Sequence, residues 1–212
     1  MNKPTATDIA ASKKLSWLLR HGAREAGVTL DLEGWASLDE VLRVLSLSEE
    51  TVLRVVASNE KKRFELDALT RRMRASQGHS EGLVDSENIE STWTRFEGES
   101  LLFHGTQRAH VAQIAKEGLI AMSRTHVHLA ASKDAVVGKR ANVDVLLAID
   151  PVKVRAEGEA LFVSPNGVIL ARRIPPSAIV GLEAMTRASR AEEAALRALF
   201  SEAIVEARTP SS

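Results

Sequence analysis

The sequence predicts an α+β protein built from two lobes, and three observations support this prediction. Residues 1–80 show helical spacing of apolar side chains followed by a hairpin pattern, whereas residues 101–183 are mostly short β segments separated by turns. Between them, residues 81–100 carry six acidic side chains against the single Arg95. Such a weakly periodic, charged stretch is typical of a connector between domains. Residues 184–212 return to helical spacing and are expected to form an appended helix.

Residues 1–80 are predicted to begin with three helices. We expect Ser12 to cap the first helix and Ser48 the third, because a serine hydroxyl accepts a hydrogen bond from a free amide of the first turn. Ser37 and Glu40 have the spacing of a capping box at the start of the second helix. The five residues 28–32 are expected to be extended.

A basic β-hairpin is predicted after the third helix. Its strands are expected at residues 63–66 and 71–76, and residues 61–74 hold six basic and two acidic side chains. Three helices followed by a hairpin is the order of a winged-helix domain. The basic side chains fit contact with a nucleic-acid phosphate backbone, and they equally fit the simple solubilisation of an exposed sheet edge. The sequence leaves both interpretations open.

The segment 101–183 is predicted to be mostly β structure. A short strand at 101–103 ends in His104-Gly105-Thr106, and a helix with Val111 and Ile114 facing inward is expected to stop at Gly118. A glycine-rich strand-to-helix fingerprint is absent from the sequence, which argues against a doubly wound nucleotide-binding fold. Further extended segments are expected at 127–130, 143–149, 161–163, 168–171 and 179–182, with turns that include Asp150-Pro151.

Composition excludes several classes of protein. The chain has no cysteine, which excludes disulfides, cysteine-ligated zinc and thiol catalysis. Its formal net charge is zero, so overall charge argues neither for nor against nucleic acid. The sequence shows neither the layout of a signal peptide nor an apolar run of membrane-spanning length. We expect a cytoplasmic protein without a membrane partner.

The segments of the sequence that suggest a chemical function are rich in arginine and histidine. Arginine carries a planar, always-charged fork that suits phosphate oxygens, so these features favour phosphate handling. His126 and His128 have the spacing of two metal ligands on one strand face, but no neighbouring carboxylate or cysteine completes a set, and no metal is expected. The features are Arg20-His21, the segment 71–80, His104-Gly105-Thr106 and Gly138-Lys139-Arg140.

Eight stretches of the chain, read together, resemble the RNA 2′-phosphotransferase family, the KptA-type tRNA-splicing phosphotransferases. They cover about residues 12–183 in the order of the family and are SKKLSWLLRH, GVTLDLEGWASLDEVL, RRMRASQGHS, LFHGTQ, EGLIAMSRTHVHLA, VVGKR, SPNGVILA and IPPSAIVGLE. The resemblance implies an N-terminal winged-helix lobe and a C-terminal lobe of ADP-ribosyltransferase type. It also implies NAD as co-substrate and an RNA carrying a 2′-phosphate as partner, in a protein expected to be a monomer.

The resemblance also implies roles for individual residues. The catalytic positions of the family fall on Arg20, His21, Arg74 and Arg140. Its NAD-binding positions fall on His104, Gly105, Thr106, His126, His128, Gly138, Ser164, Asn166 and Gly167. The sequence departs from the family pattern at Phe103, where a tyrosine is usual, and at Ala130, Ile169 and Ala171.

Two alternative functions remain open from the sequence. A winged-helix regulator without catalysis would account for residues 1–80, but it leaves the segment from His104 to Arg140 without a purpose. An ADP-ribosyltransferase that caps terminal phosphates of RNA or DNA would use the same residues and stop after the first step. The full transfer needs an acid for the departing RNA hydroxyl, and His21 is the candidate.

Overall fold

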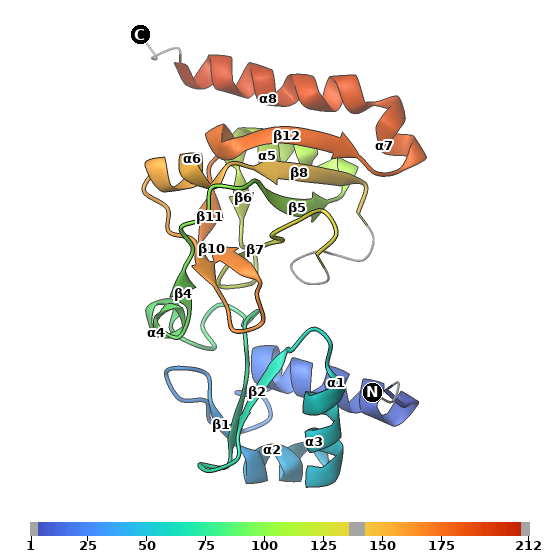
Figure 1. Ribbon diagram of the computed structural model, residues 1–212, viewed down its shortest axis with the longest axis vertical. Coiled ribbons are helices and arrows are strands. Elements are labelled where there is room, and N and C mark those ends of the chain that lie inside the picture. Colours follow the sequence, from blue (N-terminus) through green and yellow to red (C-terminus); the bar gives the residue numbers. More distant parts are fainter. Residues whose placement is uncertain (1–3, 136–142, 209–212) are drawn as a thin grey trace. The chain divides into compact units, whose positions relative to one another are not determined.

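The computed structural model describes residues 4–135 and 143–208 of the chain (Figure 1). It contains helices and antiparallel sheets, so the predicted α+β class is confirmed. Contacts divide the chain into two compact units. Unit 1 comprises Met1–Thr94, Ser123–Thr125 and Ser164–Asn166, and unit 2 comprises the remaining residues.

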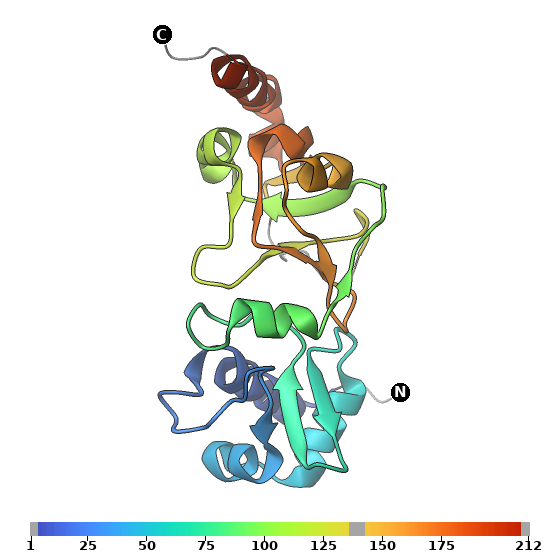
Figure 2. The same ribbon diagram turned by 90° about the vertical axis from the view of Figure 1, so that its left-hand side faces the viewer.

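Unit 1 consists of helices packed against a small antiparallel sheet. The strand order is β1-β3-β2, and β2 and β3 form the predicted hairpin, visible side by side in Figure 2. Leu15, Val41, Val52 and Met73 are fully buried between the helices and the sheet. The elements are α1 (Ala6–Trp17), a π-helix (Leu18–Gly22), β1 (Ala36–Ser37), α2 (Leu38–Leu45), α3 (Glu49–Ser58), β2 (Phe64–Asp67), β3 (Arg72–Ala75) and α4 (Ser86–Ser91).

The cap of the first helix differs from the prediction. Thr5, and not Ser12, is the N-cap of α1, and it forms a capping box with Asp8. The Thr5 hydroxyl accepts from the Asp8 amide at 3.1 Å, and the Asp8 carboxylate accepts from the Thr5 amide at 3.0 Å. Arg54 of α3 lies 3.3 Å from the same carboxylate. A contact from another helix thus stabilises an early helix start that the spacing of apolar residues did not reveal.

The capping box predicted for the second helix does not form. Ser37 precedes α2, but its side chain makes no capping hydrogen bond, because Ser37 ends strand β1 and pairs with Arg72 of β3. The first amide of α2, from Leu38, donates instead to the carbonyl of Arg71 at 2.9 Å. The extended segment expected at 28–32 contains no strand. Ser48, by contrast, caps α3 as predicted.

Unit 2 is built around three antiparallel sheets with strand orders β12-β8-β5, β4-β9-β10-β7 and β11-β6. Strand β4 (Thr94–Arg95) starts at the last residue of unit 1. The β elements of unit 2 are β5 (Leu102–Thr106), β6 (Leu119–Ile120), β7 (Val127–Leu129), β8 (Val145–Ile149), β9 (Phe162–Val163), β10 (Ile169–Ala171), β11 (Arg173–Ile174) and β12 (Ile179–Ala184). The helices are two 3-10 turns (Arg108–His110 and Pro176–Ala178), α5 (Val111–Glu117), α6 (Pro151–Ala156), α7 (Arg187–Ala191) and α8 (Glu193–Arg208).

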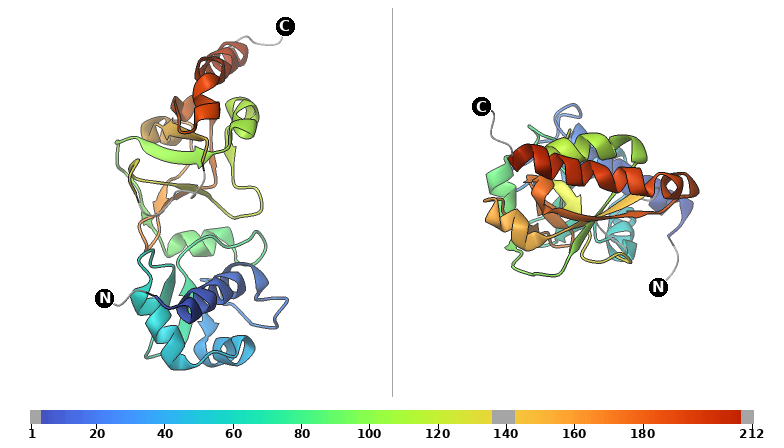
Figure 3. Two further views of the ribbon diagram at one scale, coloured as in Figure 1. Left: turned by 90° about the vertical axis from the view of Figure 1, so that its right-hand side faces the viewer. Right: turned by 90° about the horizontal axis from the view of Figure 1, so that it is seen from above.

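Helices cover the sheet β12-β8-β5 of unit 2. Helix α8 lies beside α5, as Figure 3 shows from above, and buries Leu196 in the core of this unit. The C-terminal helix predicted from the sequence is therefore present and packed. Two helices were missed: α4 lies in the predicted connector, and Asp150-Pro151 was predicted to be a turn, but Asp150 caps α6 and Pro151 occupies its first position. Proline suits that position because its missing amide would have no partner there.

Gly118 ends α5 as predicted, and its backbone has φ +81°. A Cβ at this position would lie 2.1 Å from the carbonyl oxygen of Ile174, a backbone atom that cannot turn aside. Gly158 has φ +84°, but nothing lies within 4 Å of the place where its Cβ would be. Both glycines have a positive φ, but only at Gly118 would a Cβ also clash with the backbone. Comparing substitutions at the two positions therefore distinguishes the cost of positive φ from the cost of close packing.

We expect Gly118→Ala to destabilise the protein more than Gly158→Ala does. Left-handed backbone alone costs about 1–2 kcal/mol for a residue with a Cβ, and only Gly118→Ala adds a backbone clash. Urea unfolding of the two variants measures the difference in the free energy of unfolding. If both variants lost the same free energy of unfolding, the backbone around Ile174 would have moved away from the new Cβ at position 118 without a measurable cost.

Candidate functional site

Arg20 and His21 lie on the π-helix Leu18–Gly22, which continues α1 directly. Gly22 is required there by close approach, since a Cβ would stand 2.3 Å from Cζ2 of Trp17. The indole ring therefore lies against the backbone of Gly22. Single turns of π-helix are rare in proteins, but many of those that occur lie at functional sites. They shift neighbouring side chains relative to their positions in an ordinary α-helix.

The guanidinium of Arg20 is buried, and its Nε and Nη2 atoms have no hydrogen-bond partner among the residues that the structure describes. Burial, together with the positive charges of Arg124 and Arg63, lowers the pKa of Arg20 to about 10. Buried charges in native proteins are normally paired, so donors left without an acceptor indicate a place for an anion. Arg20, Arg63 and Arg124 form what we call the arginine cluster, and all three belong to unit 1.

Arg124 reaches the arginine cluster through backbone pairing of two distant segments. The amide of Thr125 donates to the carbonyl of His79 at 3.1 Å, and the amide of Glu81 donates to the carbonyl of Ser123 at 3.2 Å. Ser80 and Arg124 face each other in this antiparallel bridge. The sequence analysis missed Arg124 and Arg63, because no local pattern marks an arginine that becomes important only through such pairing.

His21 is held by Ser80 at its Nδ1 atom, 2.7 Å from the serine Oγ. The amide of Ser80 also donates to the carbonyl of Arg20 at 2.8 Å. Partial burial lowers the pKa of His21, and the charges of Arg124 and Arg20 lower it further. His21 is therefore neutral near pH 7 in the free protein, with Nδ1 engaged and Nε2 left for a ligand.

Arg74, the second predicted catalytic arginine, lies in a different environment. Its Nε and Nη2 bind the two carboxylate oxygens of Glu65 at 3.1 and 3.0 Å, and its Nη1 donates to the carbonyl of Glu33 at 3.3 Å. Its guanidinium also lies over the ring of Trp35, 4.6 Å from the centroid. Since an arginine has five N–H donors, two of those of Arg74 remain for another ligand.

The other arginines of the hairpin are paired with carboxylates. Arg71 contacts Asp39 at 2.6 Å and Glu49 at 3.0 Å, and Arg72 contacts Asp31 at 3.0 Å. The pKa of Arg71 is raised by these two partners. Much of the basic charge that the sequence placed on the hairpin is therefore neutralised within unit 1.

Four of the predicted NAD-binding residues lie on neighbouring strands of unit 2, and a fifth directly precedes one of them. Strand β5 carries His104, Gly105 and Thr106, and the ring Nδ1 of His104 lies 2.9 Å from the carbonyl oxygen of His128 in β7. A Cβ on Gly105 would stand 2.4 Å from Cγ1 of Val143, so only glycine fits there. His126 is buried just before β7.

The remaining predicted positions are separated by the fold. Ser164 and Asn166 belong to unit 1, where the Ser164 hydroxyl donates to the Asn166 side-chain oxygen at 2.8 Å. The Asn166 amide group donates to the carbonyl of Lys61 at 2.9 Å. Gly167 belongs to unit 2 and has φ +79°. Two predicted residues, Gly138 and Arg140, lie outside the described residues.

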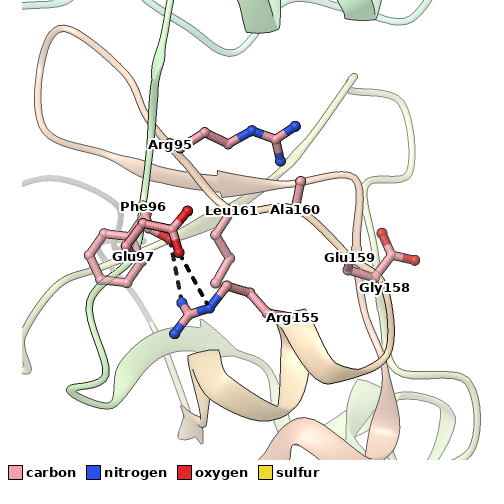
Figure 4. A pocket seen from close by; sticks show the side chains of 8 residues that line it. All are labelled: Arg95, Phe96, Glu97, Arg155, Gly158, Glu159, Ala160 and Leu161. Atoms are coloured by element: carbon pink, nitrogen blue, oxygen red, sulfur yellow. Dashed lines mark hydrogen bonds and ion pairs between the residues drawn. The ribbon is translucent and has the colours of Figure 1, made fainter.

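A small pocket in unit 2 contains none of the predicted residues. Figure 4 shows it between Arg95 and Arg155, and Arg155 donates to the carbonyl of Gly98 at 3.1 Å and lies 3.8 Å from the carboxylate of Glu97. Among residues 4–135 and 143–208, no group of three or more histidines, cysteines or carboxylates is arranged to hold a metal ion. The same part of the chain contains no helix long and apolar enough to span a membrane.

Comparisons with known proteins agree on one family. Residues 6–173 match the model of the RNA 2′-phosphotransferase, Tpt1 / KptA family. A probable RNA 2′-phosphotransferase of Pseudomonas syringae pv. tomato is 40% identical over 182 residues, which are 82% of this chain and 94% of the relative. Proteins of the same description from Rhizobium leguminosarum bv. trifolii and Acaryochloris marina are 39% and 37% identical, over 79% and 82% of this chain and 91% and 97% of the relatives.

We expect Arg124→Gln to raise the pKa of His21, because it removes a positive charge that disfavours the imidazolium. Titration of the histidine ring protons by NMR measures this pKa directly. Arg43→Gln is the matched control, since Arg43 is exposed and pairs only weakly with Glu40 at 4.0 Å. If the pKa of His21 were unchanged in the Arg124 variant, the charge of Arg124 would not act on His21.

Proposed function

The chain belongs to the RNA 2′-phosphotransferase, Tpt1 / KptA family, and we propose that it transfers an internal 2′-phosphate of RNA to NAD. The products are nicotinamide, ADP-ribose 1″,2″-cyclic phosphate and RNA with a 2′-hydroxyl. The observation that supports this proposal most strongly is the arginine cluster, in which Arg20 keeps two buried donors without an acceptor beside His21. A phosphate group is the ligand that such a cluster fits.

We also propose the finer architecture expected from the sequence. The three helices and the sheet β1-β3-β2 of unit 1 support a winged-helix lobe over residues 1–80. The antiparallel sheets of unit 2 support a lobe of ADP-ribosyltransferase type over residues 101–183. In this division residues 81–100 connect the lobes and include α4, and residues 184–212 are the appended segment that contains α8.

The arginine cluster serves substrate binding by charge. A 2′-phosphate is mostly a dianion near neutral pH, and it supplies the acceptor that Arg20 lacks. Arg63 and Arg124 add positive potential, which offsets the repulsion between this dianion and the pyrophosphate of NAD. Arg74 uses its two remaining donors, and Glu65 fixes the plane of its guanidinium. Arg140 is proposed to stabilise charge in the first step, on the resemblance alone.

The first step needs no general base. An oxygen of the 2′-phosphate already carries a negative charge and attacks C1″ of the nicotinamide ribose. The bond between C1″ and the nicotinamide nitrogen breaks, and its electron pair leaves with neutral nicotinamide. His104, Thr106 and His128 in unit 2, with the other predicted NAD positions, are proposed to hold this co-substrate. The contribution of the protein is orientation and charge compensation.

The second step needs a proton for the departing RNA oxygen. The ribose O2″ loses its proton and attacks phosphorus, the bond from phosphorus to the RNA O2′ breaks, and O2′ takes up a proton. His21 is neutral in the free protein because partial burial, and then the neighbouring arginines, lower its pKa. A bound dianion raises that pKa again, since it favours the imidazolium. His21 thus becomes an acid when the phosphate is present, and Ser80 holds its Nδ1 so that Nε2 faces the ligand.

We expect a 2′-phosphorylated RNA to lose its phosphate only when NAD is supplied, and chelators to have no effect on the rate. Product analysis separates the alternatives, because a capping ADP-ribosyltransferase leaves ADP-ribose on the RNA and a simple RNA binder releases no nicotinamide. Phosphate release without NAD, or its loss on addition of EDTA, would refute the proposed function.

We expect His21→Ala to slow phosphate release by about 10²–10⁴-fold, the usual contribution of a general acid, and to slow the first step less. The 2′-phospho-ADP-ribosylated RNA should then accumulate as a slower band on a denaturing gel. His110→Ala is the control, because His110 is an exposed histidine outside the proposed site. Equal slowing of both steps, with no band, would leave His21 as a phosphate contact.

A further inference from the structure

One exposed face of α1 and the following π-helix combines basic and aromatic side chains. Lys13 and Lys14 are adjacent in α1, and Trp17, His21 and Arg24 follow at intervals of three or four residues, with Arg24 in the turn just after the π-helix; all five are exposed. Residues at this spacing lie on one face of a helix. With a rise of about 1.5 Å per residue, this face leads from His21 back over roughly two turns to the lysines. We call it the helix-1 face.

Trp17 is the aromatic centre of the helix-1 face. It is 44% exposed, an unusual state for the largest apolar side chain, and its ring is held in place against the backbone of Gly22. The other two tryptophans are engaged differently. Trp93 is buried and donates its indole N–H to the carbonyl of Ser76, and Trp35 lies under the guanidinium of Arg74. An exposed aromatic ring one helical turn from Arg20 and His21 can serve as a stacking platform for a base.

The lysines of the helix-1 face carry charge that the protein itself does not neutralise. Neither Lys13 nor Lys14 forms an ion pair within the part of the chain that the structure describes. The hairpin differs, because Arg71, Arg72 and Arg74 are each bound by carboxylates there. The helix-1 face therefore offers a phosphate backbone basic charge that is unpaired among the described residues, whereas three of the six basic side chains at 61–74 are neutralised by carboxylates.

We propose that the helix-1 face binds the RNA strand adjoining the 2′-phosphate. A base next to the reacting nucleotide stacks on Trp17, and Lys13 and Lys14 contact the backbone phosphates beyond it. Single-stranded RNA is commonly recognised by this combination of aromatic stacking and basic side chains. The inference rests on the proposed function, because it takes the 2′-phosphate to lie at Arg20 and His21.

The first experiment measures binding and turnover of a short RNA with one internal 2′-phosphate. Trp17→Ala should weaken binding, followed by fluorescence polarisation without NAD, about 5- to 150-fold, the range of one lost base stack. KM for the RNA should rise while KM for NAD stays unchanged, and Trp17→Phe should retain most of the affinity. An RNA lacking the adjoining base should bind the wild type and the Trp17→Ala variant equally.

The second experiment measures the salt dependence of the same binding. Substituting Lys13→Gln and Lys14→Gln together should reduce the slope of log affinity against log salt by about 1.4, because each phosphate contact on a single strand contributes about 0.7. The matched control is Lys61→Gln with Lys62→Gln on the hairpin, which should leave the slope unchanged. Thermal unfolding followed by circular dichroism checks that each variant folds.

Two results would overturn the inference. One is wild-type affinity in the Trp17→Ala variant, or an equal loss in this variant whether the adjoining base is present or absent. The other is a slope that falls with Lys61→Gln and Lys62→Gln but not with the variants at Lys13 and Lys14, which would place the RNA on the hairpin. Failure of the proposed function is distinguishable, because the wild type would then bind the RNA without releasing its phosphate to NAD.

Discussion

Burial of the Arg20 guanidinium without an acceptor, near the charges of Arg63 and Arg124, is unfavourable in the free protein. Burial of a charge and the approach of like charges both raise the free energy of the folded state, and both lower the pKa of Arg20, burial the more. Any anion that binds there relieves this cost, so the proposed phosphate ligand would stabilise the folded protein. Burial and the charges of Arg124 and Arg20 lower the pKa of His21, so the charge state of this cluster and the protonation state of the histidine are coupled.

Main-chain pairing holds this unfavourable arrangement in place. The carbonyl of Arg20 accepts from the amide of Ser80, and the segment around Ser80 pairs in turn with Ser123–Thr125. Three segments far apart in sequence are thus joined by backbone hydrogen bonds, which do not change with ligand or pH. The position of the site residues is thus fixed by the main chain.

The distribution of ion pairs in unit 1 divides its basic residues into two groups. Hairpin arginines, such as Arg71 with Asp39 and Glu49, are used to fasten the sheet to the helices. The exposed lysines of α1 have no such partners among the described residues. Long-range attraction of an anion depends on net rather than total charge, so pairing within the protein reduces the attraction that the hairpin arginines exert.

Sequence alone determined the features that depend on neighbours in the chain. The α+β class, the β2–β3 hairpin, the Ser48 cap and the Gly118 helix stop follow from local spacing and from residues suited to turns and caps. Only the tertiary structure decided which charges meet. It placed Arg124 beside Arg20 and bound Arg74 to Glu65, because electrostatic partnership depends on distance in space, and pairing between distant segments sets that distance.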